Sequence, residues 1–237
     1  MESQGQKLHK AAVVNLMVGG PEGLIPWDLV LAHRQEPWVA VDKGAVRLVK
    51  MGMVPAYALG DFDSSTKAEE RAVVEAVGRV RTFPPEPKDY TDTQLGLKTV
   101  LDHYDFQQVN LWGATGGRID HFLNNLFLPL VAPFDQLLSR LQIVDRGNVV
   151  RYYTPGKYSI KKLPAMKYLA FVNLTPVHDL TLIDEKYTRL VQHWDSQVPV
   201  AWASNEFVGE VNHFSLGDGI VAVVQSRDVP GDHSGQP

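Results

Sequence analysis

The sequence has 237 residues, no cysteine, and a formal net charge of −4 from 23 basic and 27 acidic side chains. The lack of cysteine excludes disulfides, thiolate zinc sites and cysteine nucleophiles, and it fits a reducing compartment. The acidic surplus argues against nonspecific nucleic-acid binding, and no run approaches the roughly 18 apolar residues of a membrane helix. We therefore expect a cytoplasmic globular protein without nucleic-acid or membrane partners.

The first half alternates short apolar runs with helical patterns. Strands are predicted at 11–18, 39–41, 57–59 and 109–112, and helices at 45–51, 66–77, 91–104 and about 119–130. The helix at 91–104 has the clearest signal, because apolar residues recur at helical spacing from Leu97 and Thr91 with Gln94 forms a capping-box pattern. This alternation predicts an α/β domain with a parallel sheet and helices on its faces.

The second half has a different pattern. Short apolar runs dominate, and no long helical pattern is present; the runs are 143–144, 149–153, 168–172, 180–183, 198–202, 211–216 and 220–225. Gly217-Asp218-Gly219 is predicted to join the last two runs as a β-hairpin. With a turn at Thr154-Pro155-Gly156, we predict an α/β domain at 11–150, an all-β domain at 151–228, and flexible tails at 1–10 and 229–237.

Aspartates follow the predicted strands of the first half, where ligands bind in open parallel sheets. Six lie at strand-to-helix junctions: Asp42, Asp61, Asp63, Asp89, Asp92 and Asp120. Each of them, taken alone, could have a purely structural role as a helix cap or as a partner of the helix dipole. The crowding of Asp61 and Asp63 favours a bound cation, and Mg²⁺ held by carboxylates and phosphates is the usual solution. The set therefore predicts a metal–phosphate site.

The segment Gly113-Ala-Thr-Gly-Gly-Arg-Ile-Asp-His121 strengthens this prediction. Its glycines permit tight turns and close approach, its backbone N–H groups can face an anion, and Arg118 can pair with phosphate oxygens. A plain glycine-rich turn is the alternative, since neither a Walker motif nor a dinucleotide fingerprint is present. His121 and Asn125 lie one helical turn apart beyond the loop, and a histidine there is more often structural than catalytic.

Taken together, these segments resemble the thiamine pyrophosphokinase family. The matching pieces are Val41-Asp-Lys-Gly-Ala45, Gly60-Asp-Phe-Asp-Ser64, Lys88-Asp-Tyr-Thr-Asp92, Thr115-Gly-Gly-Arg-Ile-Asp-His121 with Asn125, Ser204-Asn-Glu-Phe207 and Val224-Gln-Ser-Arg227. Their order and spacing are jointly specific and extend from about Val13 to Arg227. Lys43 replaces the first residue of the family's usual Gly-Gly-Ala or Arg-Gly-Ala triplet, and the segment at 15–20 matches least.

The resemblance implies a Rossmann-like α/β domain followed by a β-sandwich, and a homodimer whose active sites are shared between subunits. It implies pyrophosphoryl transfer from ATP to the hydroxyethyl oxygen of thiamine, with Mg²⁺ required. The residues it implies for the reaction are Asp61, Asp63, Asp92, Arg118 and Asp120, of which Asp61, Asp63 and Asp92 would hold the metal. The residues it implies for the nucleotide are Asp42, Lys88, Asp89, Thr115, Gly116, Gly117 and Arg118.

For thiamine, the resemblance implies Asp120, His121, Asn125, Tyr187, Ser204 and Asn205. Tyr187 could stack on the cationic thiazolium, but a purely structural role as a half-buried strand tyrosine explains it equally well, and Trp202 competes for the stacking role.

Two other functions remain open. A phosphatase of the haloacid-dehalogenase type could use Asp61-x-Asp63 but leaves the glycine loop and the β-domain unexplained. A nucleotide- or thiamine-sensing module would not need so many metal-binding carboxylates.

Overall fold

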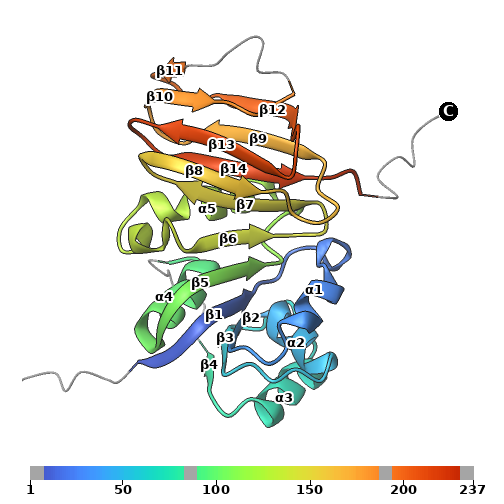
Figure 1. The fold of residues 1–237 in the computed structure, drawn as a ribbon. Coiled ribbons are helices and arrows are strands. Elements are labelled where there is room, and N and C mark those ends of the chain that lie inside the picture. The colour runs from blue at the N-terminus through green and yellow to red at the C-terminus, as the bar shows by residue number, and fades with distance from the viewer. Residues whose placement is uncertain (1–7, 83–89, 187–193, 230–237) are drawn as a thin grey trace, which may run out of the picture. The chain divides into compact units, whose positions relative to one another are not determined.

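The computed structural model describes residues 8–82, 90–186 and 194–229. The chain divides into two compact units, Met1–Asp145 and Arg146–Pro237. It is a mixed α/β protein with one large mixed sheet and a separate antiparallel sheet (Figure 1). The predicted domain boundary between residues 150 and 151 lies within strand β7 (Asn148–Tyr153), a few residues after this division.

The first unit contributes parallel strands to the large sheet. They are β1 (His9–Met17), β2 (Trp38–Val41), β3 (Tyr57–Gly60), β4 (Val80–Thr82), β5 (Tyr104–Trp112) and β6 (Leu141–Val144). Their order is β6-β5-β1-β2-β3-β4, and every pairing within this group is parallel. β1 begins at His9, inside the tail expected at residues 1–10. β4 was not predicted, because three residues are too few for a clear periodic signal.

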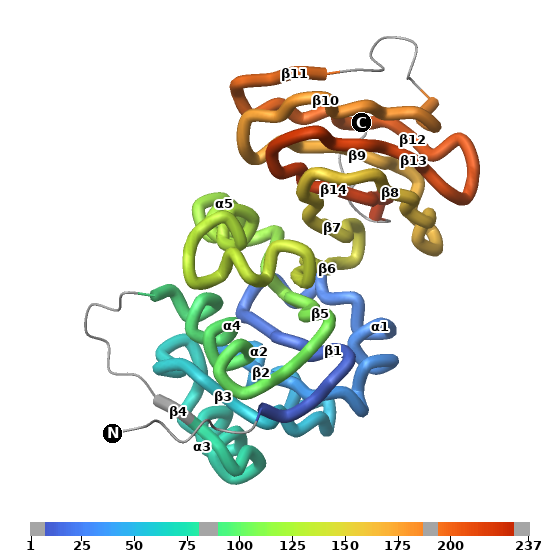
Figure 2. The backbone as a smooth tube through the Cα atoms, turned by 60° about the vertical axis from the view of Figure 1, so that its left-hand side comes forward, coloured from blue at the N-terminus to red at the C-terminus, as the bar shows by residue number. Residues whose placement is uncertain are grey.

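Helices connect these strands, and Figure 2 follows the alternation along the backbone. They are α1 (Trp27–Ala32), α2 (Lys43–Lys50), α3 (Lys67–Ala76), α4 (Asp92–His103) and α5 (Ile119–Phe127), with short 3₁₀ helices at Glu22–Leu24, Leu128–Leu130 and Phe134–Leu137. The predicted capping box of α4 is confirmed, since Gln94 N donates to Thr91 Oγ1 and Thr91 N donates to Gln94 Oε1 at 2.8 Å. Within the described part of the chain, no helix is long and apolar enough to cross a membrane.

Burial of the strands in the first unit is greatest in β2, in β3 and at the carboxyl ends of β1 and β5. β2 and β3 are buried at every residue, which explains why they appear as continuous apolar runs instead of alternating patterns. Helix α4 packs on β1, β2, β3 and β5, and α2 packs on β1 and β2. Met17 pairs in register with Ala40 and with Trp112, so β1, β2 and β5 end together. Their carboxyl ends form one edge, at which the candidate site lies.

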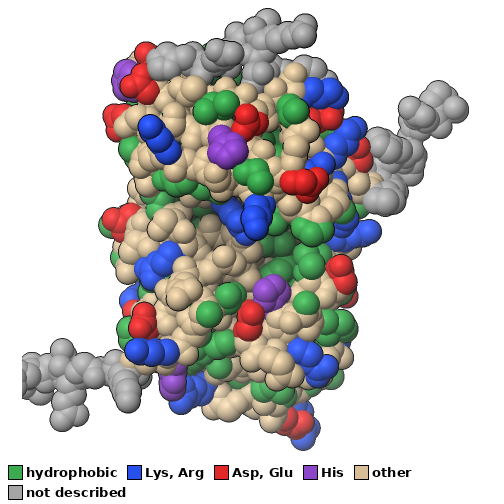
Figure 3. Space-filling model, viewed as in Figure 1, with side chains coloured by type: hydrophobic (Ala, Val, Ile, Leu, Met, Phe, Trp, Pro, Cys, Tyr) green, Lys and Arg blue, Asp and Glu red, His purple; other side chains and the backbone are tan. Residues whose placement is uncertain are grey.

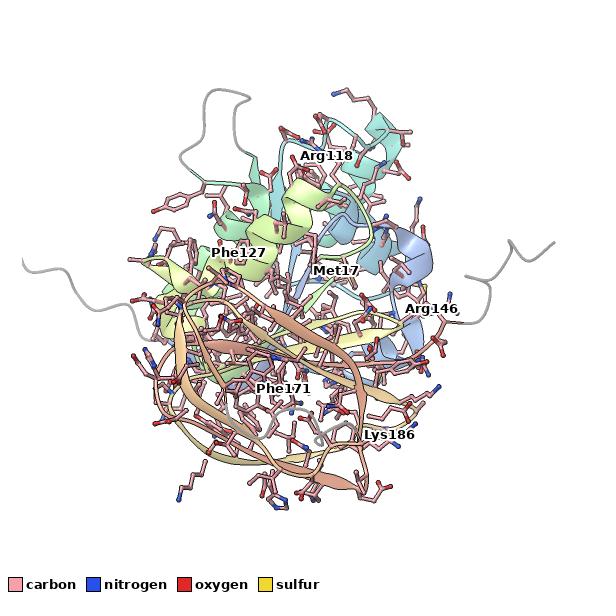
Figure 4. All side chains as sticks on the ribbon, turned by 90° about the horizontal axis from the view of Figure 1, so that it is seen from above. Met17, Arg118, Phe127, Arg146, Phe171 and Lys186 are labelled. Atoms are coloured by element: carbon pink, nitrogen blue, oxygen red, sulfur yellow. The ribbon has the colours of Figure 1, made fainter. Side chains whose placement is uncertain are left out.

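The second unit is all β in its described residues. Its strands are β7, β8 (Gly156–Lys161), β9 (Tyr168–Asn173), β10 (Val177–Leu182), β11 (Trp194–Ser196), β12 (Ala201–Glu206), β13 (Val211–Leu216) and β14 (Val221–Ser226). One antiparallel group has the order β12-β9-β14-β7, and the other has the order β11-β10-β13-β8. Both groups contribute to one apolar cluster, which includes Phe171, Phe214 and Val223. Figure 4 labels Phe171 among these strands.

The predicted hairpin between 211–216 and 220–225 is wrong. β13 pairs with β8 and β10, whereas β14 pairs with β7 and β9, so the two strands belong to different sheets. The backbone N–H groups of Gly217 and Asp218 both donate to His178 O at 3.0 Å. These bonds turn the chain out of the four-stranded sheet that contains β13. A Gly-Asp-Gly segment thus serves here as a crossing between sheets.

Charged side chains of both signs are interspersed on the face of the molecule that Figure 3 shows. No basic surface dominates that view. This agrees with the small net charge of the chain.

Candidate active site

A cavity of about 700 Å³ opens at the carboxyl ends of β1, β2 and β5. Its lining comes from five places in the first unit, which are the loop after β1, the start of α2, Ser64, the start of α4, and the loop after β5 with the first turns of α5. Eight of the predicted site residues line it: Asp42, Asp92, Thr115, Gly117, Arg118, Asp120, His121 and Asn125. The structure therefore brings together most of the predicted residues of this unit.

Asp42 links β2 to the neighbouring strand-end loop. Its backbone has φ 46°, an unusual value for a residue with a side chain, and that side chain makes no capping hydrogen bond to α2. Instead, Asp42 Oδ1 accepts a long hydrogen bond from Phe62 N at 3.4 Å. A Cβ on Gly60 would lie 1.8 Å from this same oxygen, so the carboxylate requires glycine there. The capping interpretation does not account for Asp42.

Asp61 and Asp63 do not line the cavity, although they are adjacent in sequence to residues that contact it or its lining. Phe62 between them is buried with φ 55°, and its N–H bonds to cavity-lining Asp42. Asp63 N donates to Asp61 Oδ1 at 3.1 Å, which holds the two acidic residues in one tight turn. The next residue, Ser64, does line the cavity. The turn is thus connected to the cavity through Phe62 and Ser64, whereas Asp61 and Asp63 are not among the lining residues.

Two glycine-rich loops pack directly against each other at one wall of the cavity. Gly20 N donates to Gly113 O at 2.8 Å, and Val18 N donates to Trp112 O at 2.9 Å. A Cβ on Gly20 would lie 2.1 Å from Gly113 O, so no side chain fits at that contact. The two loops are therefore in direct backbone contact, and residues of both line the cavity.

Side chains from deeper in the unit hold the loop after β5. Thr115 Oγ1 donates to Asp145 Oδ2 at 2.6 Å, and Asn125 Nδ2 donates to Ala114 O at 3.1 Å. Asp145 and Asn125 are both about 5% exposed. Gly116 lies between lining residues but does not itself line the cavity. Asn125 is thus tied to the loop backbone, a role that sequence reasoning did not assign to it.

Arg118 and Asp120 form a two-point ion pair at the start of α5. Arg118 Nε lies 3.1 Å from Asp120 Oδ1, and Arg118 Nη2 lies 2.5 Å from Asp120 Oδ2. The hydrogen bonds from Arg118 hold the pKa of Asp120 below its usual range. A guanidinium has five N–H groups, so the pairing orients the arginine while its other edge can bind phosphate oxygens. Figure 4 labels Arg118 at this position.

Two charged residues of the cavity region were missed by sequence reasoning. Arg47 lines the cavity one helical turn after Lys43, and its Nη1 donates to Gly20 O at 2.7 Å. Burial lowers the pKa of Arg47, and the nearby Glu22 carboxylate opposes that shift. The i, i+4 spacing of Lys43 and Arg47 could have revealed this basic face. Asp145 directly follows β6, so the strand-end rule that selected Asp42 applied to it as well.

The start of α4 supplies one carboxylate to the cavity lining. Asp92 and Thr91 line the cavity, and Asn124 Nδ2 of α5 lies 3.4 Å from Thr91 Oγ1. Within residues 8–82, 90–186 and 194–229, no group of three or more His, Asp or Glu side chains is arranged to hold a metal. Asp61, Asp63 and Asp92 are therefore not assembled as an all-protein metal site. Their oxygen donors still suit Mg²⁺, which commonly takes one or two carboxylates and completes its shell with phosphates and water.

The predicted thiamine residues Ser204 and Asn205 lie on β12 of the second unit. The register of β12 against β9 shifts between Trp202 and Asn205, which marks a β-bulge. Ser204 has φ 61° and is exposed. Asn205 Nδ2 donates a hydrogen bond to Glu185 Oε2. Bulges commonly redirect side chains at functional positions, and this one reorients the Ser204–Asn205 pair.

Trp202 has a packing role in the same unit. Its ring centroid lies 4.8 Å from that of Trp194 at an angle of 66°, and both rings pack against the apolar cluster. The competing prediction, Tyr187, lies outside the described residues, as do the predicted nucleotide contacts Lys88 and Asp89.

Comparisons with known proteins agree with these two units. The family model described as thiamin pyrophosphokinase, catalytic domain, matches residues 30–138, and the model described as thiamin pyrophosphokinase, vitamin B1 binding domain, matches residues 157–221. The chain belongs to the thiamine pyrophosphokinase family. The cavity lies largely within the first match, and Ser204 and Asn205 lie within the second.

Individual relatives cover nearly the whole chain. Thiamine pyrophosphokinase of Bacillus subtilis (strain 168) is 32% identical over 216 residues, which is 91% of this chain and 99% of that protein. The crystal structure of a protein from Lactobacillus plantarum is 45% identical, with a TM-score of 0.81, 92% of this chain covered and 100% of that one. A thiamin pyrophosphokinase family protein from Enterococcus faecalis is 37% identical, with a TM-score of 0.83 and the same coverage.

Proposed function

We propose that this chain transfers a pyrophosphoryl group from ATP to the hydroxyethyl oxygen of thiamine, giving thiamine diphosphate and AMP. The observation that carries the proposal is the cavity of the first unit, where two glycine loops, basic side chains and carboxylates meet at the strand ends. This combination suits a polyphosphate with a cation. Membership of the family supports the same reaction over a phosphatase or a sensing module.

The residues of the cavity have distinct proposed roles. The hydroxyl oxygen of thiamine bonds to the β-phosphorus of ATP while the bond from that phosphorus to the oxygen shared with the α-phosphate breaks. AMP leaves with that oxygen, and the hydroxyl proton passes to solvent or a nearby base. Lys43, Arg47 and Arg118 would stabilise the phosphate charge, and the loop at Thr115–Gly117 would cradle the oxygens.

Asp120 has a more limited proposed role than that of a general base. Because Arg118 lowers its pKa, this carboxylate is a weak proton acceptor. We propose that Asp120 mainly orients the hydroxyl and Arg118, with His121 and Asn125 beside it in the cavity lining. Positioning of this kind can suffice for phosphoryl-transfer chemistry.

We also propose that Mg²⁺ is required and that Asp92, with Asp61 or Asp63, provides its carboxylate ligands. When bound, the ion would neutralise phosphate charge and orient the polyphosphate. Asp42 would support this edge through its contact with the 61–63 turn and act on the nucleotide side, where Gly116, Lys88 and Asp89 are further proposed contacts.

The remaining proposals concern thiamine and assembly. Ser204 and Asn205 would bind thiamine, with Tyr187 or Trp202 as the aromatic contact. From the family resemblance, we propose a cytoplasmic homodimer with active sites shared between subunits, a Rossmann-like first unit and a sandwich-like second unit. Light scattering of the purified protein tests the dimer.

The decisive experiment measures products. Purified protein with ATP, Mg²⁺ and thiamine is expected to form AMP and thiamine diphosphate in equal amounts, with both dependent on thiamine. Release of inorganic phosphate without AMP would favour a phosphatase. Binding of either compound without any product would favour a sensing module.

A further inference from the structure

The segment 183–186 of the second unit carries a buried carboxylate that the proposed reaction does not use. Glu185 is 3% exposed, and it forms an isolated antiparallel bridge with Phe207. Burial of a carboxylate is costly, so such a group usually has a specific partner or task. Here the partner is Asn205, whose Nδ2 donates to Glu185 Oε2.

The backbone around Glu185 is held from both sides. On one side, Ile183 N donates to His213 O at 3.2 Å, and Asn212 Nδ2 donates to Asp184 O at 3.2 Å. On the other side, Lys186 N donates to Glu206 O at 3.1 Å. The carboxylate is therefore presented by a fixed stretch of chain, which is what a group needs if it is to fix the orientation of another.

Asn205 is the residue that benefits from this fixed carboxylate. Asn205 follows Ser204 in the bulge of β12, where the pairing with β9 is interrupted. The backbone of a bulge constrains the direction of a side chain less than a regular strand does. Glu206 N donates to Asn205 Oδ1 at 3.0 Å, and Glu185 accepts from Asn205 Nδ2. The amide is thus held at both its oxygen and its nitrogen, and its orientation is set before any ligand arrives.

We propose that Glu185 is a positioning residue for thiamine, acting through Asn205 to fix the amide that contacts the substrate. This inference rests on the proposed function, in which Asn205 binds thiamine. Neighbouring charges have other tasks, since Asp184 pairs with His213 and Lys186 pairs with Glu206. Burial raises the pKa of Glu185 to about 7, which agrees with a carboxyl group kept from solvent.

The test is a set of steady-state measurements in the full-length protein, with ATP and thiamine varied separately. Glu185→Ala is expected to raise the thiamine KM roughly tenfold, with smaller changes in kcat and in the ATP KM, as expected for loss of a buried hydrogen bond. Glu185→Gln keeps an oxygen acceptor and is expected to restore most of the affinity. Glu185→Asp withdraws the acceptor but keeps the charge, so it should behave like Glu185→Ala and serves if the alanine variant fails to fold.

The double variant with Asn205→Ala separates positioning from other roles. If Glu185 acts through Asn205, adding Glu185→Ala to Asn205→Ala leaves the thiamine KM unchanged. An equal further rise in the double variant, or an unchanged KM in both Glu185→Ala and Glu185→Asp, would overturn the inference. Asp184→Asn, one residue away, is the matched control and should leave the thiamine KM unaltered. Absence of thiamine turnover in the unmodified protein would instead refute the proposed function itself, and this inference with it.

Discussion

The candidate residues of the two units are positioned by different means. In the first unit, polar side chains and glycines follow directly after β1, β2 and β5, where parallel strands end at one edge. In the second unit, Ser204 and Asn205 lie inside β12, at a shift in its pairing with β9. The first arrangement needs only that paired parallel strands end at one edge, whereas the second depends on a shift in register within one antiparallel pair.

This difference predicts different consequences of mutation. A strand-end cavity gathers phosphate and metal contacts from many loops, so a change there should alter turnover. A bulge presents one or two side chains, so a change there should alter the affinity for one substrate. The comparison fails if substitutions in the two units have the same kinetic signature.

The largest effect is expected from Asp92→Asn, which removes a cavity-lining charge without changing its shape. Turnover measured by AMP release should fall by about a hundredfold or more, the scale typical for loss of one charge-stabilising group. Asp102→Asn is the matched control, because Asp102 lies on the same helix but pairs with Lys98 at 3.1 Å on the exposed face. Near-normal turnover of Asp92→Asn would contradict the metal–phosphate assignment.

Asp63→Asn adds a second comparison within the first unit. Asp63 does not line the cavity, whereas Asp92 does, so the effect of Asp63→Asn on turnover should not exceed that of Asp92→Asn. A larger loss for Asp63→Asn would place the metal at the 61–63 turn rather than at α4.

A smaller loss is expected from Gly20→Ala, which tests the contact between the two glycine loops. The added Cβ would lie 2.1 Å from Gly113 O, so the loops must separate. We expect kcat/KM for ATP to fall roughly tenfold and the free energy of unfolding to fall by about 1–3 kcal/mol. Gly23→Ala is the control, since a Cβ there meets no atom within 4 Å. If Gly20→Ala and Gly23→Ala have the same kcat/KM for ATP and the same free energy of unfolding, the contact between the two loops contributes to neither activity nor stability.

The same contrast explains what the sequence could and could not predict. Aspartates after strands were found because the strand-end rule needs only local patterns, and the same rule would have found Asp145. The capping box at Thr91 is likewise local. The crossing at Gly217–Gly219 was mistaken for a hairpin because a glycine-rich turn does not specify which strands pair. The bulge at Ser204 and the Glu185–Asn205 contact arise from long-range pairing, for which one sequence carries no signal.

In the second unit, loss of the Ser204 hydroxyl should affect thiamine binding alone. Ser204→Ala is expected to raise the thiamine KM roughly fivefold, the scale of one hydrogen bond, with kcat and the ATP KM nearly unchanged. Because Ser204 has φ 61°, Ser204→Gly removes the hydroxyl without the strain that alanine meets there. A raised KM in both variants assigns the effect to the hydroxyl. A fall in kcat with an unchanged thiamine KM would contradict the distinction between the units.

The smallest effect on turnover, and one visible mainly in stability, is expected from the pH response of Glu185. Burial raises the pKa of its carboxyl group from 4.5 to about 7 in the folded chain. Between these values the unfolded chain has lost a proton that the folded chain still holds, so the free energy of unfolding falls as pH rises through this window. The loss should be on the order of 1–3 kcal/mol, and Glu185→Gln should remove it. The pairs Asp184–His213 and Lys186–Glu206 remain in both proteins, so the difference between their urea titrations from pH 4.5 to 7 isolates Glu185. Identical pH dependence in the two proteins would mean that this carboxyl group ionises as it does in water and is not held away from solvent.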